Sequence, residues 1–165
     1  MARRVFYSFH HQADAWRTSQ VRNHGVVEGN RAVSDNDWEA VKHGGDAAIQ
    51  RWIDDQFLGR SCAVVLIGSA TANRKWINYE IIKAWNERKG VVGVNIHGLK
   101  DMLQQQSRKG ANPFDVITLD NGQRRLSSVV KAYDPPYLTS NLVYAYITEH
   151  IEHWVEEAIW IREQY

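Results

Sequence analysis

The apolar run Cys62-Ala63-Val64-Val65-Leu66-Ile67 decides the fold class of this chain. Ser61 and Gly68 bound the run and no polar residue interrupts it, which is typical of a strand buried on both faces of a parallel sheet. Residues 75–89 return to helical spacing, and residues 91–96 form a second β-branched run. Together these segments predict a right-handed βαβ unit.

Outward from this unit, the sequence predicts further elements on both sides. Residues 4–9 are rich in aromatic and β-branched side chains and predict a first strand, which ends at the polar group His10-His11-Gln12. A short helix over residues 14–23, capped by Asp14, is expected to follow. The remaining expected elements are an irregular connection over 26–45 with one helical turn at 38–42, a helix from Asp46 to Gly59, a turn-rich tract over 98–115, and a strand at 116–119 or 126–130.

The C-terminal segment predicts one long helix. Asp134-Pro135-Pro136 is a firm break in regular structure. Beyond it, apolar side chains repeat at helical spacing over roughly 20 residues, and these are Ile147, Ile151, Trp154, Val155, Ala158 and Ile159. The predicted fold is therefore α/β, with an open, mainly parallel, flavodoxin-like sheet flanked by helices and a C-terminal amphipathic helix. We expect one domain over residues 1–165, with residues 134–165 packed on it as a helical extension.

Composition excludes several classes of protein. The 165 residues are 44% hydrophobic and 24% charged, as in ordinary globular domains. A net charge of +1 gives no support for nucleic acid or an anionic membrane as the main partner. Cys62 is the only cysteine, which fits a reducing cytoplasm, and no apolar stretch predicts a signal peptide or a membrane span.

Common signatures of nucleotide and hydrolase chemistry are absent from the sequence. No Gly-x-x-x-x-Gly-Lys-Ser/Thr segment encodes a phosphate-binding P-loop, and no Gly-x-Gly-x-x-Gly follows the first strand. Gly68-Ser69-Ala70-Thr71 follows a strand but lacks the second glycine of a nucleophile elbow. The sequence therefore does not favour a serine hydrolase or a dinucleotide-binding Rossmann turn.

Two pairs of histidines are candidate ligand residues. His150 and His153 lie three positions apart on the closing helix, where both can face one metal ion or simply belong to a solvated polar face. We expect the polar face and no metal site. His10 and His11 are more informative, because ligands of open α/β sheets bind outside the carboxyl ends of the strands. The alternative for this second pair is a solvated or core position.

The segment from Asn73 to Glu80 is the most specific feature of the chain. Trp76 and Glu80 stand at i and i+4 and share a helix face, about 100° around from the apolar stripe that begins at Ile77. One carboxylate is thereby held beside an aromatic ring. The alternative places Trp76 at the rim of the core and leaves Glu80 as an exposed charge.

These motifs resemble a known family. The first strand and the Trp76-x-x-x-Glu80 helix look like those of Toll/interleukin-1 receptor (TIR) domains. The match is closer to one branch, the TIR-like ThsB proteins of bacterial Thoeris anti-phage systems, and covers most of residues 3–133. The segments that carry it are Arg4-Val5-Phe6-Tyr7-Ser8-Phe9-His10, Val21-Arg22-Asn23-His24, Val65-Leu66-Ile67-Gly68-Ser69, Asn73-Arg74-Lys75-Trp76, Tyr79-Glu80-Ile81 and Asn112-Pro113-Phe114-Asp115.

The resemblance implies an enzyme that takes NAD as its substrate, with no cofactor. Such enzymes cleave the nicotinamide–ribose bond and, in this branch, close the remaining ADP-ribose into a cyclic signalling nucleotide. The family's catalytic glutamate matches Glu80. Since nicotinamide is already a cationic leaving group, the proton-donating carboxyl of ordinary glycosidases is not needed. We expect Glu80 to hydrogen-bond the ribose hydroxyls and to stabilise the oxocarbenium-like charge.

The end of the first strand belongs to the family's substrate cleft, so we expect substrate contacts there. Phe9 can stack on a ring and His10 can contact phosphate or ribose, although many TIR enzymes carry tyrosine or arginine at this point. Asn112 can donate and accept hydrogen bonds together, and its alternative is a turn-forming role. The expected substrate-binding residues are Ser8, Phe9, His10, His11, Asp46, Trp76 and Asn112, with a helix cap as the alternative for Asp46.

A rival hypothesis of another class is a TIR-like or receiver-like module that binds a partner or a nucleotide without turning it over. A receiver domain needs an acidic cluster at the end of the first strand, where this chain has histidines. The partners implied by the resemblance are NAD, a phage-derived activator, an effector protein that senses the product, and a second copy of the chain. Trp160 lies off the apolar stripe of the closing helix and is a candidate contact for self-association, and the alternative is that it packs under a neighbouring loop.

Overall fold

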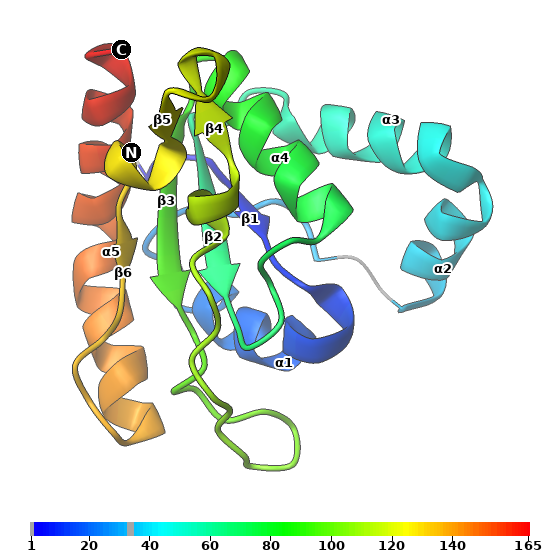
Figure 1. The fold of residues 1–165 in the computed structure, drawn as a ribbon. Coiled ribbons are helices and arrows are strands. Elements are labelled where there is room, and N and C mark those ends of the chain that lie inside the picture. The colour runs from blue at the N-terminus through cyan, green and yellow to red at the C-terminus, as the bar shows by residue number, and fades with distance from the viewer. Residues whose placement is uncertain (1, 33–34) are drawn as a thin grey trace.

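The computed structural model describes residues 2–32 and 35–165, and the sheet at its centre has the parallel order β1-β2-β3-β6 (Figure 1). β2 lies between β1 and β3, with Cys62 opposite Val5 on one side and opposite Gly90 on the other. All of its residues are buried. The strands are β1 (Val5–Ser8), β2 (Cys62–Ile67), β3 (Gly90–Asn95) and β6 (Ala132–Tyr133). The predicted central strand is confirmed at the same bounds.

Helices cover both faces of the sheet. On one face, β2 residues such as Val64 and Leu66 pack with α1 and α5, and on the other, Val65 and Ile67 pack with α3, α4 and the segment 113–130. Figure 1 shows α5 running along one side of the sheet and α4 along the other. The helices are α1 (His11–Arg22), α2 (Asp35–His43), α3 (Gly45–Phe57), α4 (Lys75–Asn86) and α5 (Ser140–Glu163). The predicted α/β class, with a mainly parallel sheet and a C-terminal helix, is confirmed.

Small elements fill the connection between β3 and β6. A two-stranded antiparallel ladder joins β4 to β5, separate from the main sheet. These elements are the 3₁₀ turns Pro113–Val116, Asp120–Gly122 and Leu126–Ser128, with β4 (Thr118–Leu119) and β5 (Arg124–Arg125). The expected strand at 116–119 is thus present only as β4, and the alternative at 126–130 is wrong because that stretch begins with a 3₁₀ turn.

Two expectations near the N-terminus are also wrong. Asp14 does not cap a helix, because α1 begins three residues earlier and His10 is its N-cap residue. Asp14 is instead buried and pairs with Arg17 at 3.1 Å. The connection 26–45 contains the nine-residue helix α2 rather than a single turn, and its residues 33–34 lie outside the part that the structure describes.

Arg17 joins α1 to the loop that follows β3. Its Nε donates to the carbonyl of Leu99 at 2.9 Å, and its Nη2 donates to that of Gln105 at 2.9 Å. Burial raises the pKa of Asp14, and the neighbouring Arg17 charge opposes that rise. Arg17 therefore holds the loop after β3 against α1, near the carboxyl ends of β2 and β3.

α5 is the longest helix, and its two tryptophans lie in different surroundings. Trp154 is 3% exposed and stacks on Tyr133 of β6 with ring centroids 4.5 Å apart, whereas Trp160 is 61% exposed. No helix among the described residues is long and apolar enough to cross a membrane. The backbone of α5 also lies very close to β3, since a Cβ added at Gly90 would stand 2.8 Å from the amide nitrogen of Ile159.

Replacing Gly90 with alanine is therefore predicted to destabilise the fold by about 1–3 kcal/mol, because the helix backbone cannot move aside as a side chain can. Urea unfolding measures the change. Gly98→Ala is the matched control, since the atoms nearest to its added Cβ belong to the Val143 side chain, at 3.0 Å or more. An unchanged midpoint for Gly90→Ala would show that α5 does not press on β3.

Candidate functional site

A cavity of about 960 Å³ opens at the carboxyl ends of β1 and β2, which is where open α/β sheets bind ligands. Residues 9–12 after β1 and residues 72–77 after β2 line it, together with Trp38 of α2 and Trp52 of α3. Its size falls within the range of small-molecule sites. We refer to this cavity as the β1–β2 pocket.

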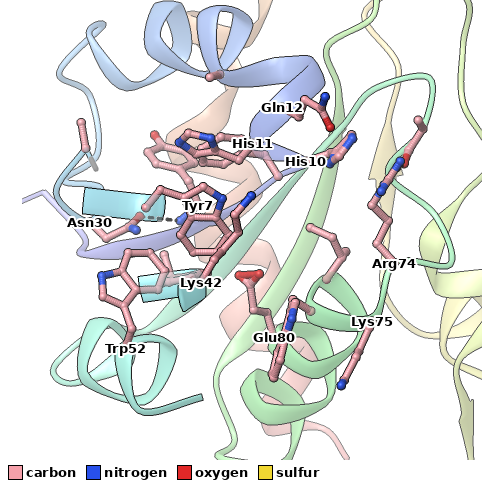
Figure 2. Close-up of a pocket in the computed structure, with 18 of the residues that line it drawn as sticks. Tyr7, His10, His11, Gln12, Asn30, Lys42, Trp52, Arg74, Lys75 and Glu80 are labelled. Carbon is pink, nitrogen blue, oxygen red and sulfur yellow. Dashed lines mark hydrogen bonds between the residues drawn. The ribbon is translucent and has the colours of Figure 1, made fainter. Parts of the chain in front are cut away.

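Glu80 extends from α4 into the β1–β2 pocket, and Figure 2 shows its carboxylate directed away from the helix, between Trp52 on one side and Arg74 on the other. Its side chain is only 7% exposed. Burial raises the pKa of Glu80 well above its usual range, and the buried Ser8 hydroxyl beside it opposes part of that rise. The alternative of an exposed charge is therefore wrong.

The loop between β2 and α4 sets the direction in which α4 starts. The Thr71 hydroxyl accepts a hydrogen bond from the Gly68 amide at 2.8 Å, and Arg74 Nε donates to the Ala70 carbonyl at 2.8 Å. Asn73 adopts a left-handed conformation with φ of 67°, which asparagine tolerates better than most residues. This loop lets α4 begin at Lys75 with its first turn beside the pocket.

Trp76 forms part of the rim one turn before Glu80. It is half-buried, its ring meets Tyr79 edge-on with centroids 5.6 Å apart, and Lys75 Nζ lies 5.0 Å from its ring centroid. The i, i+4 spacing thus brings Trp76 and Glu80 to one cavity, as the sequence predicted.

Opposite α4, four rings form a continuous aromatic wall made of Phe9, His11, Trp38 and Trp52. Successive centroids are 5.7, 5.5 and 5.6 Å apart along this order. All four line the cavity. Such a wall offers flat apolar faces to a planar ligand group.

His10 lies at the end of β1 and faces the pocket near Arg74 (Figure 2). Burial lowers its pKa, and the positive charge of Arg74 lowers it further. The ring is therefore held toward its neutral form, in which one nitrogen donates a hydrogen bond and the other accepts one.

The β1–β2 pocket is more basic than the whole chain. Among the described residues that line it, Glu80 is the only carboxylate. The lysines and arginines that line it are Arg22, Arg31, Lys42, Arg74 and Lys75. The net charge of +1 conceals this concentration, which favours a ligand carrying negative charge. The N-terminal ends of α1 and α4 also direct partial positive charge to the pocket.

The structure brings together most of the predicted site residues, but not all. Phe9, His10, His11 and Trp76 line the pocket with Glu80, and Ser8 is buried behind it. Asp46 is instead exposed and forms an ion pair with Lys75 outside the cavity. It does not cap α3 either, because Gly44 is the N-cap residue.

Asn112 also lies outside the pocket. Its side-chain oxygen accepts a hydrogen bond from the Phe114 amide at 2.9 Å and caps a 3₁₀ turn, so the geometry is that of the turn-forming alternative. His150 stacks on Tyr146 with centroids 4.0 Å apart. Within residues 2–32 and 35–165, no three metal-ligating side chains gather.

Comparison with known families agrees with this architecture. The family model of the Thoeris protein ThsB, TIR-like domain, matches residues 6–101. The chain belongs to this family. The matched segment contains β1 from Phe6 onward, the loop before α4, and Glu80, so it includes both walls of the pocket.

A curated relative supports the family assignment. The protein named "Putative cyclic ADP-D-ribose synthase ThsB1" from Bacillus cereus (strain MSX-D12) is 38% identical over 122 residues. The aligned region covers 71% of this ThsB-type chain and 64% of the relative. The chain therefore matches just under two thirds of that relative's length.

Sequence reasoning missed several pocket residues. Arg22 stands at the far end of α1 from His11, and Trp38 and Trp52 come from helices that follow an irregular connection. The helical periodicity predicted Trp52 as a core residue and gave no indication that Arg22 lines a pocket. These side chains reach the pocket only because tertiary packing brings α1, α2 and α3 together beside β1.

Burial of Glu80 predicts a pH-dependent stability. The folded protein binds the proton of Glu80 more tightly than the unfolded chain does, so protonation of Glu80 favours the folded state at low pH. This contribution to the free energy of unfolding is lost as pH rises from about 4.5 through the raised pKa of Glu80. Glu80→Gln keeps the neutral shape, so we expect it to melt higher than wild type at pH 8 and equally at pH 4.

Thermal melts across this pH range measure the difference. Glu152→Gln, a change on the exposed surface of α5, is the control and should follow the wild-type curve. A Glu80→Gln variant that is less stable than wild type at pH 8 would contradict the burial argument.

Proposed function

We propose that this ThsB-type domain cleaves the nicotinamide–ribose bond of NAD and closes the remaining ADP-ribose into a cyclic signalling nucleotide. The observation that carries the proposal is Glu80, a buried carboxylate held alone among the cations and aromatic rings of the β1–β2 pocket. The printed name of the relative, a cyclic ADP-D-ribose synthase, supports the same chemistry.

The leaving group of this reaction does not need a proton donor. When the bond between the anomeric carbon and the pyridinium nitrogen breaks, the electron pair neutralises the nicotinamide, so no acid has to protonate it. Positive charge then develops on the ribose ring. A fixed carboxylate within a poorly solvated pocket stabilises that charge more strongly than one in water does.

Glu80 is suited to this role because its environment makes it basic. Without a ligand, burial favours its protonated form. The pyridinium charge of NAD favours the carboxylate, so substrate binding shifts the equilibrium toward the reactive form. After the bond breaks, Glu80 can accept the proton of the hydroxyl that attacks the anomeric carbon of the ADP-ribosyl cation. Attack by water gives ADP-ribose, and attack by a hydroxyl of the same ADP-ribosyl cation gives the cyclic product.

The rest of the pocket fits the other parts of a dinucleotide. Its cations favour the diphosphate, and the aromatic wall offers stacking surfaces for a base. His10, held toward its neutral form, can donate to or accept from a ribose hydroxyl. We assign substrate contacts to Phe9, His10, His11 and Trp76 on these grounds.

We further propose three partners for this reaction: an activator that arises during phage infection, an effector that senses the product, and a second copy of the chain. The exposed Trp160 is the proposed contact between copies. The rival hypothesis of a binding module without turnover predicts the same pocket but no release of nicotinamide.

Glu80→Gln is predicted to reduce nicotinamide release by about 10²–10³-fold, because it removes the charge that stabilises the transition state. Purified protein is incubated with NAD, with and without lysate from infected cells, and the products are separated by mass. Glu152→Gln is the control. A product one water lighter than ADP-ribose supports cyclisation, and ADP-ribose alone supports hydrolysis instead.

Release of nicotinamide at the wild-type rate by Glu80→Gln would remove Glu80 from the mechanism. Absence of release from wild type in every lysate would favour the binding module.

Self-association makes a separate prediction. If copies must meet to work, specific activity should rise with protein concentration, and Trp160→Ala should shift this rise to higher concentration. Activity assays over a dilution series measure it, with melting temperature as the check on folding. Specific activity that is independent of concentration in both proteins would exclude a requirement for assembly through Trp160.

A further inference from the structure

Arg22, the last residue of α1, lines the β1–β2 pocket from beside β1. Its guanidinium carbon lies 5.7 Å from the centroid of the Tyr7 ring and 5.9 Å from that of Phe9. The side chain is half-buried, and its Nε is buried with no hydrogen-bond partner in the part of the chain that the structure describes. A charged donor is thus held over two aromatic faces at the wall of a cavity.

Three of the other four cations that line the pocket have partners, and the fourth, Arg31, is exposed. Lys42 pairs with Glu39 at 3.0 Å, Lys75 pairs with Asp46, and Arg74 donates to the Ala70 carbonyl. Among the described residues, the Arg22 side chain contacts aromatic rings but forms no hydrogen bond or ion pair. Burial disfavours its charge and lowers its pKa.

Aromatic rings stabilise a guanidinium by cation–π attraction but offer no lone pair to its N–H groups. A buried arginine without an acceptor is costly to a fold. The hydroxyl of Tyr7, beneath Arg22, is also buried and finds no hydrogen-bond partner within residues 2–32 and 35–165. The described residues therefore offer the Arg22 guanidinium no acceptor, and the β1–β2 pocket lies beside it.

We propose that Arg22 binds the diphosphate of a dinucleotide substrate and thereby positions the ribosyl bond at Glu80. The proposal rests on the proposed function. A planar guanidinium matches two phosphate oxygens with parallel hydrogen bonds. Phe9, which Arg22 contacts, is also the first ring of the aromatic wall. A base joined to the bound diphosphate can therefore lie against that wall while the other ribose reaches α4.

Arg22→Gln tests this assignment, and ADP-ribose is the probe, because it keeps the diphosphate and has already lost the labile bond. Calorimetric titration of the full chain should show binding weakened about 10- to 100-fold, as expected for loss of charged hydrogen bonds. Arg22→Lys keeps the charge without the planar fork and should give a smaller loss. Arg51→Gln, an exposed change outside the pocket, should bind as wild type.

Two further measurements separate recognition of a ligand from a structural role. Adenosine, which lacks the diphosphate, should bind wild type and Arg22→Gln equally. The melting temperature of Arg22→Gln should be equal to or above that of wild type, because an unpaired buried charge is removed. A large fall in melting temperature would show that Arg22 is structural and overturn the proposal.

Inorganic pyrophosphate distinguishes a dinucleotide from a simple anion. It should compete with ADP-ribose only weakly, and equal affinity for both would overturn the assignment to a dinucleotide. ADP-ribose binding that is unchanged by Arg22→Gln would also overturn it, even if NAD is cleaved. Conversely, Arg22-dependent ADP-ribose binding without any cleavage of NAD would support the subsite and reject the proposed reaction.

Discussion

Parallel pairing of β2 with both of its neighbours is the constraint on which the site depends. β2 is buried on both faces and pairs with β1 and β3 in the same direction, so the carboxyl ends of these strands meet at one edge. The chain leaves that edge after Ser8 to form α1 and after Ile67 to form the loop before α4. Residues far apart in the chain therefore share the β1–β2 pocket.

The burial that stabilises this edge also sets the chemistry of Glu80. Its carboxyl lies on the buried side of α4 beside Ile77 and Ile81, where ionisation is disfavoured. A fully apolar residue would suit the free protein better at this position. Keeping a carboxyl there lowers the stability of the free protein, and under the proposed function it supplies a group that responds to the pyridinium charge of the substrate.

Charge is distributed in a way that composition conceals. The chain is nearly neutral overall, but five basic side chains and one carboxylate line the pocket. Acidic residues outside it, such as Glu39 and Asp46, hold lysines at the rim. Arg22 has no acidic partner among the residues that the structure describes, so an anionic ligand would balance its charge.

The sequence alone determined the central strand at its observed bounds, the α/β class, and the common face of Trp76 and Glu80, because these follow from periodicity among residues close in the chain. Sequence patterns did not determine that Glu80 is buried, that Asn112 only caps a turn, or that Arg22 reaches the pocket. Nor did they reveal β6, whose two residues are too few for a pattern. These features were decided by tertiary packing, because burial and electrostatic environment arise from segments that meet only when the sheet and helices assemble.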